Sequence, residues 1–277
     1  MIQIAIYIQM YTPLSLALEY RHNDVAKLLL THGARADVSV NWHSWHSGDR
    51  KTTPLLLYMG GRGPNIDILS LLIAAGGDVD QEGYRAIHDY IGHAIIKTSA
   101  LITAIFNNDK EVVKYMLPYS NNVNGMLHHA IYNTDTSILE LLLNYPGVDI
   151  NALNTSKETI LHRAIYKEKY NAVRVILNTP GVDIGIKSYK HQTPFDTAVT
   201  HKRYEAMKLL LSYHDGVKVK ELAEQCIHLA AYKNDPIMLA MLVDAGVDKS
   251  YKNYKGKTPL DIAIENDKKK AIKWLSQ

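Results

Sequence analysis

Apolar residues occur along the chain in short runs that come in pairs and are separated by polar turns. At 159–164 the sequence reads Thr-Ile-Leu-His-Arg-Ala, and a second run, Val-Arg-Val-Ile-Leu, follows at 173–177. Short apolar runs of this kind are typical of helices that bury one face. A Thr can cap such a helix, and a Pro at the next position fits its first turn. The pattern therefore predicts a short helix followed by a returning helix.

The helix pairs repeat with a nearly constant period. The segment Pro-Gly-Val-Asp-Ile at 146–150 returns unchanged at 180–184, and the run that starts at Thr159 returns at Thr193, 34 positions later. Gly181 directly follows a returning helix, where a left-handed C-cap needs no side chain. Since one pair cannot bury its own apolar faces, the pairs must stack. We therefore expect one all-α domain over 1–277, a solenoid of about eight helix pairs with hairpin loops. Its repeats start near 12, 53, 99, 125, 159, 193, 225 and 258.

Two insertions interrupt the period. The first, 38–52, separates the first two repeats and contains Trp-His-Ser-Trp-His at 42–46. The second, 85–98, contains Arg-Ala-Ile-His at 85–88, which resembles another motif start. Because a complete helix pair follows Ser99, we take Ser99 as the start of the third repeat and 85–98 as an inserted helix.

The repeated motif resembles the T-P-L-H-x-A signature of the ankyrin-repeat family, whose period is near 33 residues. Thr-Pro-Leu stands at 12–14, 53–55 and 258–260, and the resemblance covers residues 12–277. It implies a non-catalytic scaffold that binds a partner protein through its concave face and hairpin tips, without a cofactor. His128, His162 and His228 occupy the histidine position of the motif. The resemblance implies that they are structural and bond backbone between neighbouring repeats.

The irregular insertions and the high Tyr and Asn content are similar to those of ankyrin proteins from poxviruses and intracellular bacteria. Such proteins bind host factors in the cytosol of a host cell, and many viral ones end in an F-box-like segment that recruits ubiquitin ligases. This sequence ends on a repeat instead. The resemblance therefore implies a cytoplasmic, host-targeted binder without the ligase-recruiting segment.

Composition narrows the classes of protein further. The formal net charge of +3 is too small to argue for nucleic acid on its own. The single cysteine, Cys226, excludes an internal disulfide framework, and its place in a helical motif predicts a buried, inert thiol. No run reaches the roughly 18–20 apolar residues that span a bilayer, and 1–10 lacks the basic region of a signal peptide. We expect a monomer with a protein partner, no small-molecule substrate and no membrane.

The binding surface that the resemblance implies can be placed by residue number. In the family, the second and third residues after the motif's alanine point to the concave face. In repeats three to seven the second position is aromatic in four of five cases, and Tyr offers apolar area with a polar tip. These positions, the hairpin tips and the first insertion give the candidate residues Phe106, Tyr132, Asn133, Tyr166, Lys167, Tyr189, Lys190, His201, Tyr232, Lys233, Tyr254, Lys255, Trp42 and Trp45. We expect a tyrosine-lined, mildly basic groove for an acidic or extended segment, the alternative being that these rings cover neighbouring helices.

Two other functions stay open at this point. His43 and His46 could begin a metal site with Asp49, so the insertion at 40–50 is where an enzyme or metal-binding function would lie. A nucleic-acid binder would use the basic hairpin tips, through salt-dependent phosphate contacts. Those tips carry Lys187, Lys190, Lys252, Lys255 and Lys257. The sequence contains no phosphate loop, no Gly-x-Ser-x-Gly elbow and no His-Glu-x-x-His motif.

The resemblance also implies one modification site. Asn151 follows Asp149 and Ile150, at the asparagine position of the family's Asp-Val-Asn-Ala segment. In the eukaryotic cytosol that asparagine is often hydroxylated by an oxygen-sensing hydroxylase. Gly185 and Lys249 stand at the equivalent positions of two other repeats, so we expect Asn151 to be the single site.

Overall fold

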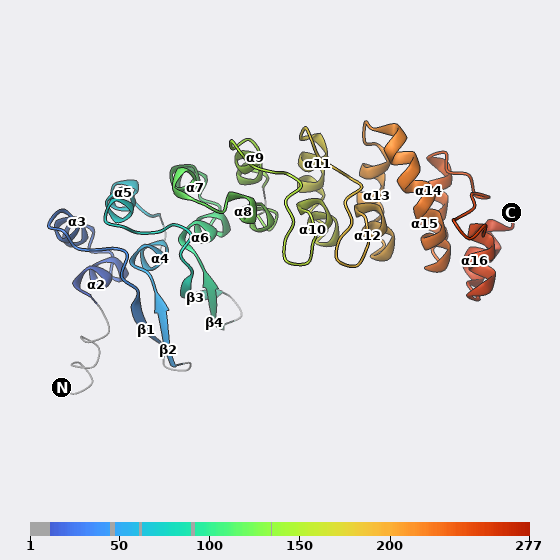
Figure 1. The fold of residues 1–277 in the computed structure, drawn as a ribbon. Coiled ribbons are helices and arrows are strands. Elements are labelled where there is room, and N and C mark those ends of the chain that lie inside the picture. The colour runs from blue at the N-terminus through green and yellow to red at the C-terminus, as the bar shows by residue number, and fades with distance from the viewer. Residues whose placement is uncertain (1–11, 45–47, 61–62, 90–91, 134) are drawn as a thin grey trace. The chain divides into compact units, whose positions relative to one another are not determined.

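Short helices in pairs make up most of the structure, a computed structural model that describes residues 12–44, 48–60, 63–89, 92–133 and 135–277. In each pair a first helix is followed by a tight turn and a second helix (Figure 1). The expected all-α repeat fold is confirmed, with two β-hairpins added to it. The chain divides into two compact units, Met1–Asn133 and Thr134–Gln277.

The first unit contains helix pairs and both hairpins. Its first helices are α2 (Pro13–Glu19), α4 (Pro54–Met59), α6 (Ala100–Phe106) and α8 (Val123–Ala130). Its second helices are α3 (Asn23–Thr31), α5 (Ile66–Ala74) and α7 (Lys110–Met116), the last continued by the 3-10 turn η1 (Leu117–Tyr119). The strands are β1 (Val40–Ser44), β2 (Gly48–Thr52), β3 (Gly83–Asp89) and β4 (Gly92–Thr98).

The second unit is helical over its described residues. It begins with the second helix α9 (Ser137–Leu143). Its first helices are α10 (Ile160–Tyr166), α12 (Pro194–Thr200), α14 (Gly216–Tyr232) and α16 (Pro259–Glu265). The second helices are α11 (Tyr170–Asn178), α13 (Tyr204–Leu211), α15 (Pro236–Asp244) and α17 (Lys269–Leu275). Each first helix packs on the next, and α11 packs on α13, so the core lies between two layers (Figure 1).

The Thr residues of the motif start the first helices, as the sequence predicts. In α12, Thr193 Oγ1 accepts from the Asp196 amide at 3.2 Å, and the Asp196 carboxylate accepts from the Thr193 amide at 2.9 Å. This reciprocal capping box satisfies two backbone donors that a helix start otherwise leaves unpaired. Pro194 follows at a position where its missing N–H costs no hydrogen bond. Thr159 and Thr258 form the same kind of box at α10 and α16.

Left-handed residues close the helices. Glu168, Lys202 and Asn234 follow first helices at φ of 59°, 55° and 56°, so the same tight turn recurs along the second unit. Gly181 has φ 83°, the left-handed conformation that we expected, but the C-cap residue of α11 is Thr179, whose backbone is extended, so Gly181 belongs to the turn after the cap. The turns hold the last residues of successive first helices in equivalent positions.

Two motif histidines join neighbouring repeats, as the resemblance implies. His162 Nε2 bonds the Gln192 carbonyl at 2.9 Å, and His228 Nε2 bonds the Lys257 carbonyl at 2.9 Å. Burial lowers the pKa of both imidazoles below the usual range. Near neutral pH each ring is therefore uncharged and donates one N–H to a hairpin loop of the next repeat.

The segment 85–98 is not the inserted helix that we expected. Strands β3 (Gly83–Asp89) and β4 (Gly92–Thr98) pair antiparallel, with Arg85 opposite Ile96 and Gly83 opposite Thr98. Ile is frequent in this segment and favours strands, whereas Gly92 would weaken a helix at its centre. The Ala-Ile-His triplet resembles the repeat motif, but it lacks the N-cap and returning helix that the motif needs.

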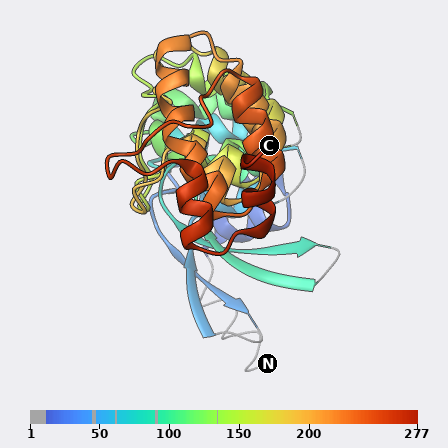
Figure 2. The same ribbon diagram turned by 90° about the vertical axis from the view of Figure 1, so that its right-hand side faces the viewer.

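The first insertion also forms a hairpin, β1–β2, in which Val40 pairs with Thr52. Strand β2 lies beside β3, and both hairpins extend away from the helices of their unit (Figure 2). The backbone of Trp42 belongs to β1, opposite Arg50. Trp45 and His46 lie outside the described residues, so the role of this tip stays a prediction.

Two predicted repeat starts are shifted. Helix α8 begins after its N-cap Asn122, before the expected start at 125. Helix α14 begins at Gly216, so the expected start at 225 lies inside one continuous helix of 17 residues. Asp215 caps it by accepting from the Lys218 amide at 3.2 Å. The early cap converts the hairpin loop of this repeat into helix, and a hairpin tip is absent between α13 and α14.

Shortening the first hairpin should leave the protein folded. Val40 and Thr52 are buried and directly opposite each other, so a two-residue Asn-Gly turn can replace residues 41–51. We expect the free energy of unfolding to change by no more than about 1 kcal/mol, because the removed residues lie outside the helix stack. Urea denaturation of both forms checks this. A much larger loss would show that the hairpin is part of the core.

Candidate functional site

A row of basic residues ends three adjacent first helices of the second unit. Lys167, His201 and Lys233 are the C-cap residues of α10, α12 and α14. Helix α12 packs against both α10 and α14. The C-terminal end of a helix carries partial negative charge, which favours a cation there. The sequence placed all three residues on the candidate surface, and the structure brings them into one line, which we call the C-cap row.

Exposed tyrosines accompany this row. Tyr166 and Tyr232 precede Lys167 and Lys233 and are 42% and 47% exposed. Thr200 takes the equivalent place before His201 and is half-buried. Both residues therefore keep part of their surface in solvent, where a partner can reach it.

Contacts between repeats hold the site in place. The Tyr166 ring meets the His201 ring edge-on, with centroids 4.8 Å apart. Arg203 Nη2 donates to the Tyr166 carbonyl at 3.2 Å, and its Nη1 lies 2.6 Å from Glu168 Oε1. Lys167 Nζ lies 5.3 Å from the centroid of the Tyr166 ring. The turns after α10 and α12 are thus joined by a ring contact, a hydrogen bond and an ion pair.

The carboxylates beside the row are already neutralised. Glu168 pairs with Arg203, and Glu265 Oε1 lies 2.5 Å from Lys257 Nζ. Within the described part of the chain, Lys190 and Lys233 form no salt bridge. The second unit holds 21 of the 31 Lys and Arg residues and 17 of the 28 Asp and Glu residues, so its formal charge is +4. The face therefore has positive charge to offer to an anionic partner.

His201 lies among these charges. Burial lowers the pKa of its imidazole below the usual range, and the charges of Arg203, Lys190 and Lys233 lower it further. The ring is therefore mostly uncharged near neutral pH. A carboxylate bound beside it would offset the like charges and favour the imidazolium form.

Two hairpin tips of the second unit carry the predicted Tyr-Lys pairs. Tyr189 and Tyr254 are 73% and 92% exposed. The Ser188 amide bonds the Gln192 carbonyl at 2.9 Å, and the Asn253 amide bonds the Lys257 carbonyl at 2.9 Å. Each closed loop presents its Tyr-Lys pair at the tip, and Lys255 Nζ lies 5.5 Å from the Tyr254 ring centroid.

The aromatic candidate residues of the first unit also contact neighbouring rings. Phe106 is 46% exposed, but its ring contacts His129 with centroids 5.6 Å apart and lies 6.4 Å from the ring of Tyr132. Tyr132 and Asn133 are half-buried. In this unit the aromatic residues at the second position after the motif's alanine thus also contribute to packing. The sequence alone could not distinguish a packing role from a binding role.

The alternative chemistries gain no support from the described residues. Among them, no three His, Cys, Asp or Glu side chains are grouped as a metal site would need. Cys226 is buried and donates to Asp196 Oδ1 at 3.4 Å, and burial raises its pKa well above the usual range. That thiol is inert, as expected. Among the lysines at the hairpin tips, which a nucleic-acid binder would use, Lys257 forms an ion pair with Glu265. Within the described residues, no helix is long and apolar enough to cross a bilayer.

Asn151 has a structural role that the sequence did not reveal. Its Nδ2 donates to the Gly181 carbonyl at 2.8 Å, and its Oδ1 accepts from the Asp183 amide at 2.8 Å. The half-buried amide thus joins the loop after α9 to the loop after α11. Hydroxylation of Asn151 stays a prediction.

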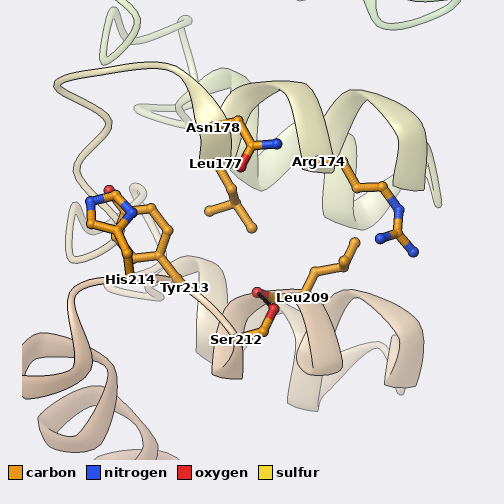
Figure 3. A pocket seen from close by; sticks show the side chains of 7 residues that line it. All are labelled: Arg174, Leu177, Asn178, Leu209, Ser212, Tyr213 and His214. Atoms are coloured by element: carbon orange, nitrogen blue, oxygen red, sulfur yellow. Dashed lines mark hydrogen bonds between the residues drawn. The ribbon is translucent and has the colours of Figure 1, made fainter.

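A pocket of about 250 Å³ lies on the second helices (Figure 3). It opens between the ends of α11 and α13 and is lined by Arg174, Leu177, Asn178, Leu209, Ser212, Tyr213 and His214. The Arg174 guanidinium lies 3.3 Å from Glu205 Oε1, so its charge is already compensated. None of the predicted site residues lines this pocket.

Stacked helix pairs, capped by Thr and closed by left-handed turns, define a helical-repeat protein. Comparison with family models identifies the kind of repeat. The model for ankyrin repeats in three copies matches residues 91–154 and 127–221, and the single ankyrin-repeat model matches 10–41. These matches cover more than half of the chain, which belongs to the ankyrin-repeat family. Ankyrin repeats are generally protein–protein interaction modules, and proteins of the family are typically non-enzymatic scaffolds.

A solved structure shows the same fold. The chain is similar to the protein in "Crystal Structure of EF0377 an Ankyrin Repeat Protein", with a TM-score of 0.50 and 21% identity. The match covers 64% of this chain and 96% of that one. No curated protein sequence matches this chain significantly.

Sequence reasoning missed the residues that fix the C-cap row. Arg203 and Glu168 form the ion pair that joins two turns, and neither is at the second or third position after the motif's alanine. Reading one and two positions further along each repeat would have found them as opposite charges. Lys268, whose Nζ lies 5.2 Å from the Tyr232 ring centroid, was missed because it belongs to the turn before α17.

Proposed function

We propose that this protein is a non-catalytic scaffold that binds another protein through the first helices and hairpin tips of residues 134–277. The observation that carries the proposal is the pair Tyr166 and Tyr232, exposed at equivalent positions beside the basic C-cap row. Exposed aromatic rings on a rigid frame lose little entropy when they are covered by a partner. Similarity to host-factor-binding ankyrin proteins suggests that the partner is a host protein.

The family supports the choice of surface. Ankyrin-repeat proteins mostly meet their partners with the concave face, which their first helices and hairpin tips build. In the second unit this face offers the tyrosines of the C-cap row together with Tyr189 and Tyr254 at the tips. The tyrosines provide apolar area, and the lysines beside them provide charge complementarity toward an acidic partner.

Affinity capture from a eukaryotic cell lysate tests the proposal. The wild-type protein and the double variant Tyr166→Ala/Tyr232→Ala are used as baits, and bound proteins are quantified by mass spectrometry. The partner is the protein that wild type retains and the double variant loses. Identical bound proteins on both baits would place the interface elsewhere. Capture of nucleic acid in place of protein, lost in moderate salt, would favour the nucleic-acid alternative.

A further inference from the structure

The C-cap row has a regular spacing that selects the shape of its partner, provided that the proposed protein-binding function holds. Lys167, His201 and Lys233 stand at the same point of three adjacent first helices. Packed helices lie about 8–10 Å apart. The row therefore presents one basic group about every 8–10 Å in the direction of the stack.

An extended polyproline II segment matches this spacing. It has three residues per turn and a rise of about 3.1 Å per residue, so the same face returns after about 9.3 Å. Side chains at every third position would then meet successive members of the row. A β-strand returns to the same face after about 6.6–6.8 Å, which fits the row less well.

The charge of the C-cap row determines which side chains the bound segment needs at every third position. Lys233 is half-buried and forms no salt bridge with the described carboxylates. Glu168 is held by Arg203, and Glu265 is held by Lys257. Lys190 adds a further exposed ammonium group from the hairpin tip before α12. A carboxylate at each third position would supply the charge that this face lacks.

The tyrosines favour the same conformation. Tyr166 and Tyr232 are partly exposed beside the row, and the His201 ring meets the Tyr166 ring edge-on. Grooves lined by aromatic rings are the usual receptors of polyproline II segments, whose preformed shape loses little entropy on binding. Apolar or proline residues between the acidic positions would pack on these rings.

We propose that the C-cap row binds an extended, polyproline II-like segment of a partner protein that carries Asp or Glu at every third residue. The three carboxylates lie opposite Lys167, His201 and Lys233, and the residues between them contact Tyr166 and Tyr232. The spacing of the acidic residues along the partner, as well as its net charge, thus decides whether it binds.

Fluorescence anisotropy with labelled synthetic peptides on the full chain tests the register. The probe is three Glu-Pro-Pro triplets, and the control peptide has the same composition with its three glutamates adjacent. We expect the spaced peptide to bind at least about tenfold more tightly, a difference that three matched charge contacts can supply. Equal affinity of the two peptides would overturn the proposal.

Matched variants test the residues. Lys167→Gln/Lys233→Gln should weaken binding of the spaced peptide by about tenfold or more, whereas Lys208→Gln/Lys270→Gln should change it less than about twofold. Both variants remove two positive charges from the same unit, and Lys208 and Lys270 are exposed on second helices. If both variants weaken binding equally, the effect depends only on the net charge of the protein, and the proposal is overturned.

A third peptide, with phosphoserine in place of each glutamate, separates acidic from phosphorylated partners. Binding of this peptide without binding of the glutamate form would overturn the proposal in favour of a phosphoprotein. If no peptide binds while the captured partner still requires Tyr166 and Tyr232, the C-cap row proposal fails and the protein-binding function stands. If the Tyr166→Ala/Tyr232→Ala variant retains the captured partner as well as wild type does, the proposed function itself fails.

The pH dependence provides a readout specific to His201. Burial lowers the pKa of His201 in the free protein, and the charges that face it, Arg203, Lys190 and Lys233, lower it further, with Glu168 bound to Arg203. A bound carboxylate raises that pKa, so binding takes up a proton and tightens as pH falls from 7.5 to 5.5. Glutamates stay ionised over this range. The increase should vanish in His201→Gln, and its persistence in that variant would contradict the assignment.

Discussion

Replacing Phe195 with Ala should lower the free energy of unfolding of residues 134–277 by about 3–5 kcal/mol, the usual cost of emptying a buried Phe site. Phe195 is fully buried in α12. This helix is the first of its pair, and it packs on the first helices of both neighbouring pairs, α10 and α14. In a repeat stack each unit depends on its neighbours, so the loss also weakens the contacts on both sides. Since domains are stable by only about 5–15 kcal/mol, urea denaturation should show a large shift of the midpoint.

The chain contains its own control for this experiment. Its one other phenylalanine, Phe106, is 46% exposed at the end of α6. Because Phe106 keeps about half of its surface in solvent whereas Phe195 keeps none, Phe106→Ala should cost clearly less, about 1 kcal/mol. Similar losses for the two variants would contradict the described core, as would a folded Phe195→Ala protein of unchanged stability.

The double variant Tyr166→Ala/Tyr232→Ala should weaken binding of the captured partner by at least about 100-fold. Aromatic residues at the centre of an interface cost roughly 2 kcal/mol or more each when truncated, and about 1.4 kcal/mol corresponds to a tenfold change in Kd. Isothermal titration calorimetry with the purified partner measures the change. The melting temperature should stay nearly constant, because both rings are partly in solvent.

Ile237→Ala is the matched control for the tyrosine variant. Ile237 is 57% exposed on α15, a second helix of the same unit, so its removal takes away apolar surface outside the proposed interface. Partner affinity should be unchanged within about twofold, since surface positions away from an interface contribute little. A large fall in melting temperature for the tyrosine variant would instead show that Tyr166 and Tyr232 are packing residues.

The helical repeat was predictable because its determinants are local. Thr159, Thr193 and Thr258 cap helices by bonding a backbone amide three residues on, and this geometry needs only the motif itself. Gly181 adopts a positive φ in the turn after α11, a conformation that glycine tolerates without strain. Such signals lie within a few residues of each other, so the sequence reveals them without knowledge of the rest of the fold.

The two errors arose where local signals compete. Ala-Ile-His at 86–88 resembles the start of a repeat, but the partner strand at 92–98 decides the structure through pairing that the motif does not report. In α14, Asp215 starts the helix early and turns an expected hairpin tip into helix. A cap that lies ten residues before the motif is not visible in the motif itself.

The positions of the C-cap row were predictable from the sequence, but the contacts around them were not. Counting from the motif's alanine placed Lys167, His201 and Lys233 on one surface, because equivalent positions of a repeat share a face. The ring contact between Tyr166 and His201 and the Arg203 ion pair depend on side chains of adjacent repeats, which spacing alone does not join.

Hydrogen exchange of the full chain, measured by mass spectrometry with and without the captured partner, locates the interface. We expect slower exchange where first helices end and at the hairpin tips, in peptides covering 166–168, 188–192, 200–203 and 232–234. Exchange in α11, α13 and α15 should not change. Protection confined to those second helices, or absent from the ends of α10, α12 and α14, would contradict the proposed interface.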